Sequence, residues 1–169
     1  MVQDVERNAC VASGLNPSPR WRGMAFRLAD HTADIAIEAE AATLGDALSE
    51  AAQALVCVVT GRDSPKVVGP LYEEASFSLE APDRPSLVVA FLAELLWLLA
   101  SKDVLWAGGG VAVEDQPDGG LKLTARGNTV RYDASRHGRG VEVKAVTYHD
   151  LRCERGKDGR WRLHVLLDV

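Results

Sequence analysis

The spacing of apolar residues near the start of the chain predicts a strand followed by a helix. From Asp34 to Glu40 apolar and acidic residues alternate, which is typical of a strand with one buried face. Thr43 then predicts a helix start, because its hydroxyl can accept a hydrogen bond from a free amide and Asp46 stands at the third helical position. Gly61 predicts the end of this helix. The apolar stripe between them consists of Leu44, Leu48, Ala51, Ala52, Leu55 and Val59.

A second strand and a second helix follow a linker that contains two prolines. Alternate residues of 75–79 are apolar and predict a strand with one inward face. Pro85 is expected to open a helix over 87–100. Because this helix is apolar nearly all round, we expect it to be buried on most sides. Its apolar run contains Glu94 and is too short to span a bilayer.

The remainder of the chain is predicted to form strands. Residues 111–114 and 121–125 flank Pro117-Asp118-Gly119-Gly120, which indicates a hairpin. The run Gly108-Gly109-Gly110 is interpreted as a turn, because it precedes a strand and lacks the helix N-terminus that a phosphate-binding loop uses.

The last two strands, over 141–154 and 161–168, permit a prediction of register. A two-residue turn at Asp158-Gly159 would point their apolar faces apart, whereas a loop with an odd number of residues aligns them. We therefore expect four cross-strand pairs, which are Cys153 with Leu163, Leu151 with Val165, His149 with Leu167, and Tyr148 with Asp168.

Together these elements predict a single α+β domain over residues 24–169, with two helices packed on a largely antiparallel sheet. Residues 1–23 contain Asn16-Pro17-Ser18-Pro19 and no hydrophobic periodicity. We interpret them as a flexible N-terminal extension, with Met24 as an alternative start.

Composition excludes several classes of protein. Of the 169 residues, 47% are hydrophobic and 25% charged, unlike a disordered, collagen-like or coiled-coil chain. The net charge of −5 argues against a protein whose main task is to coat nucleic acid. The charge is uneven, since residues 1–119 sum to −10 and residues 120–169 to +5. We interpret the basic part as solvated strand surface, with a basic face for a charged partner as the alternative.

The cysteines favour a reducing environment. Cys10, Cys57 and Cys153 are odd in number and show no C-x-x-C spacing, so they support neither a disulfide framework nor a zinc cluster. Cys57 and Cys153 fall on apolar faces and are predicted to be inert buried thiols. Residues 1–23 lack the apolar stretch of a signal peptide, so we expect a cytoplasmic protein without a membrane association.

Two clusters are candidates for chemistry, and the common enzyme motifs are absent from the sequence. One cluster is Asp30-His31-Thr32-Ala33-Asp34, and the other is Asp168 beside the α-carboxylate of Val169. Carboxylates are ligands that Ca²⁺ and Mg²⁺ prefer. If the last strand brings Asp168 near Asp34, the anionic groups would repel one another unless a cation or a basic partner is present.

A simpler interpretation of the same residues is structural. Asp30 and Asp34 can close an Asx turn, and Asp168 can be a solvated end residue. A lone histidine such as His31 or His149 is more often a hydrogen-bonded structural residue than a catalyst. Neither has a neighbouring serine or cysteine, so neither indicates a nucleophilic triad. Spacing alone favours this interpretation.

Four segments, in this order, resemble the archease family. They are Asp30-His31-Thr32-Ala33-Asp34-Ile35, the helix segment 91–96, the strand segment 141–150 and the closing Asp168-Val169. The similarity runs from about Phe26 to Val169, and it departs from the family pattern at residues 1–23 and 108–110. The resemblance implies an archease-like fold for the domain.

The resemblance also implies a function, that of an accessory protein rather than an enzyme. Archeases assist the RNA ligase that joins a 3′-phosphate or 2′,3′-cyclic phosphate end to a 5′-hydroxyl end in tRNA splicing and RNA repair. They promote the GTP-dependent loading of GMP onto that ligase and its multiple turnover. The implied partner is therefore a tRNA-splicing RNA ligase, and no stable direct binding of nucleic acid is expected.

Site residues follow from the same resemblance. It implies a divalent metal, calcium in the first place with magnesium or manganese as alternatives. The implied metal ligands are Asp34, Asp168 and Val169. Four further residues match polar positions of the family, namely His31, Lys144, Tyr148 and His149. They are expected to shape the acidic tip, which is the end of the fold that contains Asp34 and Asp168, or to contact the ligase.

Two rival functions from other classes remain. A stand-alone metal-dependent hydrolase is disfavoured, because the sequence shows no evident general base or nucleophile. A chaperone-like modulator of an RNA-modifying enzyme, such as a tRNA methyltransferase, is compatible with the same fold.

Overall fold

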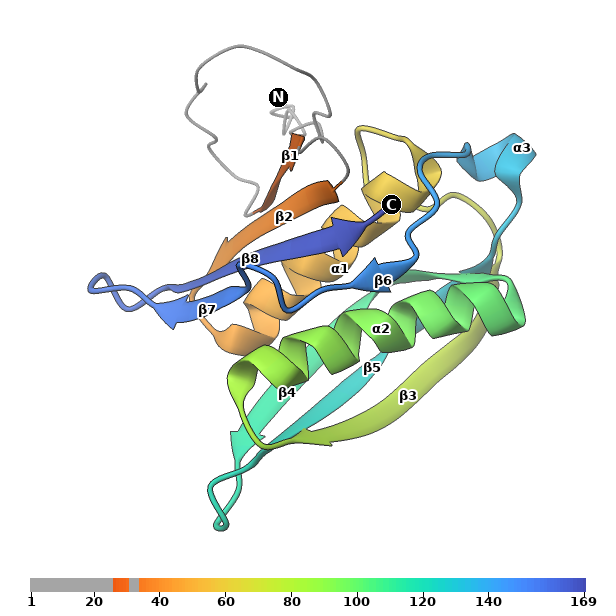
Figure 1. Ribbon diagram of the computed structural model, residues 1–169. Coiled ribbons are helices and arrows are strands. Elements are labelled where there is room, and N and C mark those ends of the chain that lie inside the picture. The colour runs from red at the N-terminus through yellow and green to blue at the C-terminus, as the bar shows by residue number, and fades with distance from the viewer. Residues whose placement is uncertain (1–25, 31–33) are drawn as a thin grey trace, which may run out of the picture.

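The structure is a computed structural model that describes residues 26–30 and 34–169. The predicted N-terminal extension, residues 1–23, lies outside the described residues, and so does His31. Figure 1 shows two antiparallel sheets with two long helices between them. The α+β class is confirmed, with the strands divided between two sheets.

The first sheet contains the residues of the predicted tip. Its strand order is β1-β2-β8-β6, and β7 also pairs with β8. The strands are β1 (Phe26–Asp30), β2 (Asp34–Ala41), β6 (Ala145–Val146), β7 (Arg152–Arg155) and β8 (Trp161–Asp168). The second sheet has the order β3-β5-β4 and contains β3 (Leu71–Ala81), β4 (Val104–Asp115) and β5 (Leu121–Arg131).

Helix α1 (Leu44–Thr60) forms as the sequence predicts. The Thr43 hydroxyl oxygen accepts a hydrogen bond from the Asp46 amide at 3.0 Å, and Gly61 ends the helix in the left-handed conformation. The last carbonyls are satisfied from a distant segment, since the Gly140 amide donates to the Val59 oxygen at 2.9 Å. A side-chain carbon at Gly140 would lie 1.9 Å from a neighbouring carbonyl oxygen, so this approach requires glycine.

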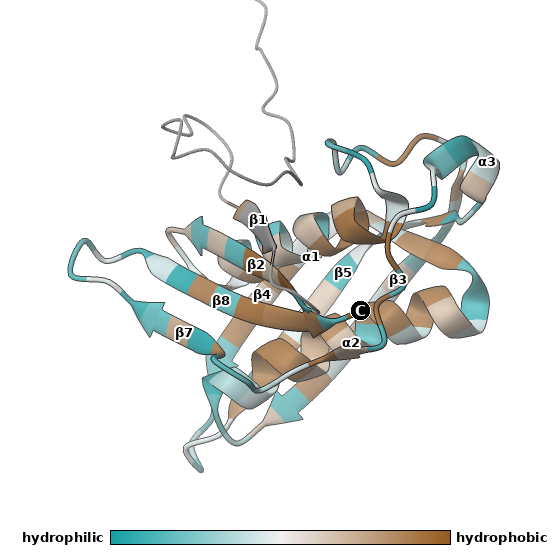
Figure 2. Cartoon of the chain, turned by 45° about the horizontal axis from the view of Figure 1, so that its top comes forward, coloured by the Kyte–Doolittle hydropathy of each residue, from teal (hydrophilic) through white to brown (hydrophobic). Residues whose placement is uncertain are grey.

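Helix α2 (Arg84–Lys102) begins at Asp83, whose carboxylate accepts from the Ser86 amide at 2.8 Å. One side of α2 lies in the core, where Phe91 and Leu92 are fully buried. The expectation that α2 is buried on most sides is wrong, because its other side stays apolar and exposed. Trp97 on that side is 53% exposed, and Figure 2 shows α2 mostly in brown and white. At 19 residues α2 is longer than the expected helix over 87–100, and it is long and apolar enough to cross a membrane, a property that the core helices of soluble proteins share.

The three consecutive glycines do not form a turn, and that interpretation is wrong. Gly108, Gly109 and Gly110 lie inside β4, at a register shift in its pairing with β5 between Trp106 and Gly109. Gly108 has a φ of +112°, which only glycine adopts readily. The predicted hairpin is confirmed, because the Gly119 amide donates to the Gln116 oxygen at 3.0 Å in the connection between β4 and β5.

The predicted register of the last strands is right in one part and wrong in another. A five-residue loop joins β7 to β8, and Cys153 pairs with Leu163 as predicted. The continuous strand over 141–154 is wrong, because residues 147–151 interrupt it. Nearer the chain end Ala145, not Tyr148, lies opposite Asp168.

A buried histidine fastens the short helix α3 (Ala134–His137) to the linker before β3. His137 is 1% exposed. Its Nδ1 accepts a hydrogen bond from the Asp133 amide at 3.0 Å, and its Nε2 lies 2.8 Å from the Val68 oxygen. Because Nδ1 accepts from an amide, Nε2 carries the proton and donates to Val68. This histidine therefore has a structural role.

Candidate functional site

The candidate site lies where β2 begins and β8 ends. Asp34 is the first residue of β2, Asp168 is the last of β8, and the two are direct cross-strand partners. Directly opposite residues of an antiparallel pair point to the same face, with Cβ atoms about 5 Å apart. Both residues are half-buried. The fold therefore brings together the two carboxylates that the sequence only suggested were neighbours.

Val169 and Lys144 complete this end of the sheet, which we call the acidic tip (Asp34, Asp168, Val169 and Lys144). The Lys144 amide donates to the Asp168 oxygen at 2.8 Å, which holds the segment before β6 against the end of β8. The Lys144 ammonium, Nζ, donates to an oxygen of Val169 at 3.0 Å. A cationic side chain is thus already in contact with one of the three predicted metal ligands.

The donor set of the acidic tip fits a hard divalent cation. Two carboxylates on one face and a main-chain oxygen beside them are ligands of the kind that Ca²⁺, Mg²⁺ and Mn²⁺ take. Within residues 26–30 and 34–169, no group of three or more His, Cys, Asp and Glu residues is arranged to hold a metal. Asp34 and Asp168 therefore need Val169, or groups from a partner, to complete a coordination shell.

Tyr148 and His149 lie on a protrusion rather than in the strand that the sequence predicted. The pairing partners of β8 shift by three residues between β6 and β7, so residues 148–151 leave the ladder, whereas the Thr147 amide still donates to the Leu166 oxygen at 3.0 Å. The Leu151 amide donates to the Tyr148 oxygen at 3.3 Å and closes a turn. Tyr148 is 62% exposed and His149 is also exposed. Both side chains are accessible on the sheet edge that contains Lys144.

A polar network beside this protrusion was not predicted. Asp150 has a φ of +47° and accepts hydrogen bonds from the Arg152 guanidinium at 2.7 and 3.0 Å. These hydrogen bonds hold the pKa of Asp150 below its ordinary value. His164 lies between Asp150, at 3.4 Å from Nε2, and Glu38, at 3.5 Å from Nδ1. The only sequence signal for this network was the polar alternation of the strands, which does not identify partners.

Four basic residues of the C-terminal part, Arg126, Arg152, Arg160 and Arg162, are paired with acids. Arg160 and Arg162 both contact Glu40, at 2.5 and 3.2 Å, and Arg162 also pairs with Asp158. Figure 2 shows the outer end of the β7–β8 hairpin mostly in teal. At Arg160 and Arg162 the positive charge therefore lies in exposed ion pairs on the strand surface.

The two described cysteines do not form a reactive site. Cys57 is 2% exposed, and burial raises the pKa of the Cys153 thiol to about 11. Their prediction as inert thiols agrees with these surroundings.

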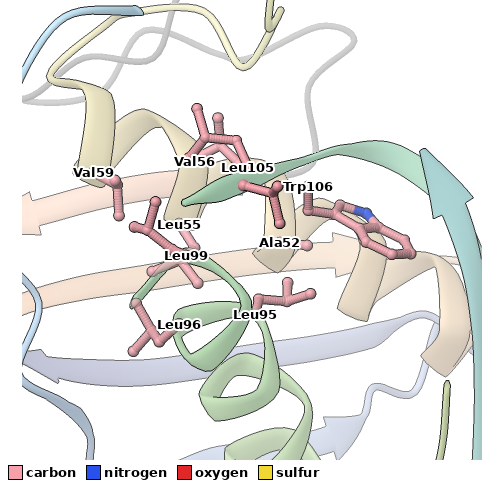
Figure 3. A pocket seen from close by; sticks show the side chains of 10 residues that line it. Ala52, Leu55, Val56, Val59, Leu95, Leu96, Leu99, Leu105 and Trp106 are labelled. Carbon is pink, nitrogen blue, oxygen red and sulfur yellow. The ribbon is translucent and has the colours of Figure 1, made fainter. Parts of the chain in front are cut away.

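An apolar hollow lies between α1, α2 and the start of β4 (Figure 3). It is lined by Ala52, Leu55, Val56, Val59, Leu95, Leu96, Leu99, Val104, Leu105 and Trp106. A small-molecule site ordinarily adds a few polar groups that orient the ligand, and none of these side chains supplies an acid, a base or an amide. The acidic tip is therefore the candidate functional site of the described residues.

Comparisons with known proteins find one family. The model of the archease protein family (MTH1598/TM1083) matches residues 26–169. A protein archease of Pyrococcus furiosus is 36% identical over 141 residues, which cover 83% of this chain and 95% of that protein. A protein archease of Methanosarcina barkeri is 31% identical over 148 residues, which cover 88% of this chain and 98% of that protein.

Solved structures share the fold. The solution structure of Methanobacterium thermoautotrophicum protein 1598 is 30% identical with a TM-score of 0.67, and the match covers 86% of this chain and 99% of that one. A Thermotoga maritima crystal structure, described as an archease and possible chaperone, is 22% identical with a TM-score of 0.50. That match covers 91% of this chain and 100% of the other. Because the family model matches residues 26–169 and the Pyrococcus furiosus protein is 36% identical over 83% of this chain, this chain belongs to the archease family.

Proposed function

We propose that this protein is an activator of the GTP-dependent RNA ligase that joins 3′-phosphate and 5′-hydroxyl RNA ends, and that a divalent cation at the acidic tip is part of its action. One observation carries the proposal, the direct cross-strand pairing of Asp34 with Asp168. Two carboxylates held opposite each other at a strand end favour a cation or a basic partner, because without either they repel. The choice of the ligase as partner rests on the resemblance to archeases in sequence, and membership of that family supports it.

The chain's own part in this function is to present oxygen ligands on a rigid support. β2 and β8 pair along eight residue positions, so backbone hydrogen bonds fix the main chain of Asp34 and Asp168 on a packed sheet. Their carboxylates are therefore presented from a rigid support. A divalent cation held by Asp34, Asp168 and Val169 would supply positive charge that attracts phosphate oxygens. The exposed Tyr148 and His149 offer polar contacts to the ligase beside the tip. Such a small polar contact suits a transient encounter.

Loading of GMP onto the purified ligase tests the proposal. The parent protein, Asp34→Asn and Asp168→Asn are compared at equal concentration, with Glu80→Gln as control. Glu80 is an exposed carboxylate on β3, in the other sheet. We expect the two tip variants to lose the stimulation and the control to retain it. Full stimulation by both tip variants would refute the role of the tip.

The same variants separate function from folding. Two like charges directly opposite each other destabilise a strand pair, so removing one should leave the melting temperature unchanged or slightly higher. A large fall in melting temperature would show instead that Asp34 or Asp168 is needed for the fold. In that case a loss of stimulation would not count in favour of the proposal.

A second candidate is a chaperone-like modulator of an RNA-modifying enzyme such as a tRNA methyltransferase. The observation that favours it is the exposed apolar side of α2, with Trp97 53% exposed. The Thermotoga maritima relative is also described as a possible chaperone. Methyltransferase activity and solubility, measured with the parent protein and with Trp97→Ser, would test it. An effect that depends on Trp97 and not on Asp168 would favour this function over ligase activation.

A further inference from the structure

Lys144 makes two separate contacts at the end of β8. Its main-chain amide donates to the Asp168 oxygen at 2.8 Å, and the neighbouring Ala145 is the cross-strand partner of Asp168. Its side-chain ammonium donates to a Val169 oxygen at 3.0 Å. The first contact holds the strands together and does not depend on the side chain. The second contact therefore has a role that strand pairing does not explain.

The charges around Lys144 indicate that role. Asp34 and Asp168 repel each other across the β2–β8 pair, and the ammonium is the cation that the described residues place in contact with the same strand end. A lysine ammonium is a compact point charge on a flexible stem, able to leave one oxygen for another or for water. It can therefore occupy this place when a metal is absent and leave it when a metal binds.

We propose that Lys144 is a built-in counter-cation that competes with the divalent cation for the Val169 oxygen. The proposal rests on the metal site of the proposed function and deepens it. When a divalent cation takes the Val169 oxygen, the Lys144 ammonium moves away, because the two positive charges repel. Binding of the cation thus releases a lysine beside the tip, where it becomes available to an anionic group of the partner.

The competition predicts whether the affinity for the divalent cation rises or falls when Lys144 is replaced. A positioning residue that merely oriented Val169 would lower the affinity for the cation when removed. A competitor raises it when removed, because the cation no longer displaces an ammonium or lies near a like charge. A unit charge about 5 Å from a divalent ion in a solvated site corresponds to roughly a tenfold change in the dissociation constant. We therefore expect Lys144→Met to bind the cation about five- to tenfold more tightly.

Calorimetric titration of the metal-free protein with Ca²⁺, Mg²⁺ and Mn²⁺ measures this directly, without the ligase. Lys144→Met keeps the length of the side chain and the main-chain hydrogen bond. Lys157→Met is the matched control, since it removes the same charge in the loop between β7 and β8, at the far end of the hairpin. Lys144→Arg keeps the positive charge, and we expect its affinity to stay near that of the parent.

The measured affinities decide whether Lys144 competes with the cation or only orients Val169. Tighter binding by Lys144→Met, with Lys157→Met unchanged, supports the competition. Equal or weaker binding by Lys144→Met overturns it. A parent protein that binds none of the three cations overturns this inference together with the metal site. Ligase activation remains a separate question in that case, because the GMP-loading assay with Asp34→Asn and Asp168→Asn answers it independently.

Discussion

The glycine run in β4 offers a sharp test of the packing, because two adjacent and chemically identical residues have opposite surroundings. A side-chain carbon at Gly109 would lie 2.3 Å from the Arg126 oxygen and 2.4 Å from the Gly127 Cα on β5. A carbon at Gly110 would meet nothing within 4 Å. The two substitutions Gly109→Ala and Gly110→Ala therefore add the same methyl group to a closed position and to an open one.

The expected magnitudes follow from these distances. At Gly109 the two backbones must separate by about 1 Å to reach ordinary contact, which costs about 1–3 kcal/mol for overpacking. A lost hydrogen bond of the β4–β5 ladder would add about 1 kcal/mol. At Gly110 the alanine restricts the unfolded chain and stabilises the fold by about 0.4–1 kcal/mol.

Thermal unfolding followed by circular dichroism measures both variants. For a domain of this size each kcal/mol shifts the melting temperature by about 2–4 °C. We expect Gly109→Ala to melt about 4–16 °C below the parent and Gly110→Ala to melt at or slightly above it. Equal melting temperatures for the two variants would show that the β4 bulge does not bring the backbones as close as described.

Three further predictions concern polar groups. His137→Leu removes the hydrogen bonds to the Asp133 amide and the Val68 oxygen, so denaturant unfolding should show a loss of about 1–3 kcal/mol. Because burial raises the pKa of Cys153 to about 11, its alkylation at pH 8 should be about a hundredfold slower than that of an ordinary thiol and should accelerate up to that pKa. Equal rates would show that the thiol is not desolvated. The pKa of Asp150 is lowered by hydrogen bonds from Arg152, so its ionised form stabilises the fold above the ordinary carboxyl pKa, and this contribution is lost as the pH falls through the lowered pKa. Asp150→Asn should therefore be less stable than the parent near neutral pH and equally stable in strong acid, as measured by unfolding across pH.

The elements that could be predicted from sequence are those specified by neighbouring residues. The cap of α1 needs only Thr43 and Asp46, three positions apart, and its end needs only Gly61. The odd loop between β7 and β8 follows from matching the apolar residues of two adjacent strands, and the pair Cys153 and Leu163 confirms it. Local capping and local face matching are visible in a sequence because all partners lie within one helix or hairpin.

Features that depend on how closely backbones approach, or on how the layers cover one another, could not be predicted. The glycine run resembles a turn by composition, and only the approach of β5 at Gly127 explains why glycine is required inside β4. Apolar periodicity shows that α2 lacks a polar face, but the absence of a polar face does not specify how many sides other elements cover. Trp97 is exposed because the sheets and α1 leave that side of α2 open.

The candidate site contains, within a few residues, both features that could be predicted from sequence and features that could not. Asp34 and Asp168 end adjacent strands, and the alternation of β2 and β8 constrains their faces, so their proximity follows from the patterns once β2 and β8 are paired. Tyr148 and His149 sit in a stretch whose alternation continues without interruption, from Val143 to Cys153, and therefore reads as one strand. A shift of three residues reverses the face of every position beyond it, so Ala145 rather than Tyr148 reaches Asp168. The turn is closed by Asp150 in a left-handed conformation and held by Arg152, contacts that periodicity does not record. The consequence for function is specific, because the same shift that removes Tyr148 from the ladder brings Lys144 to the end of β8.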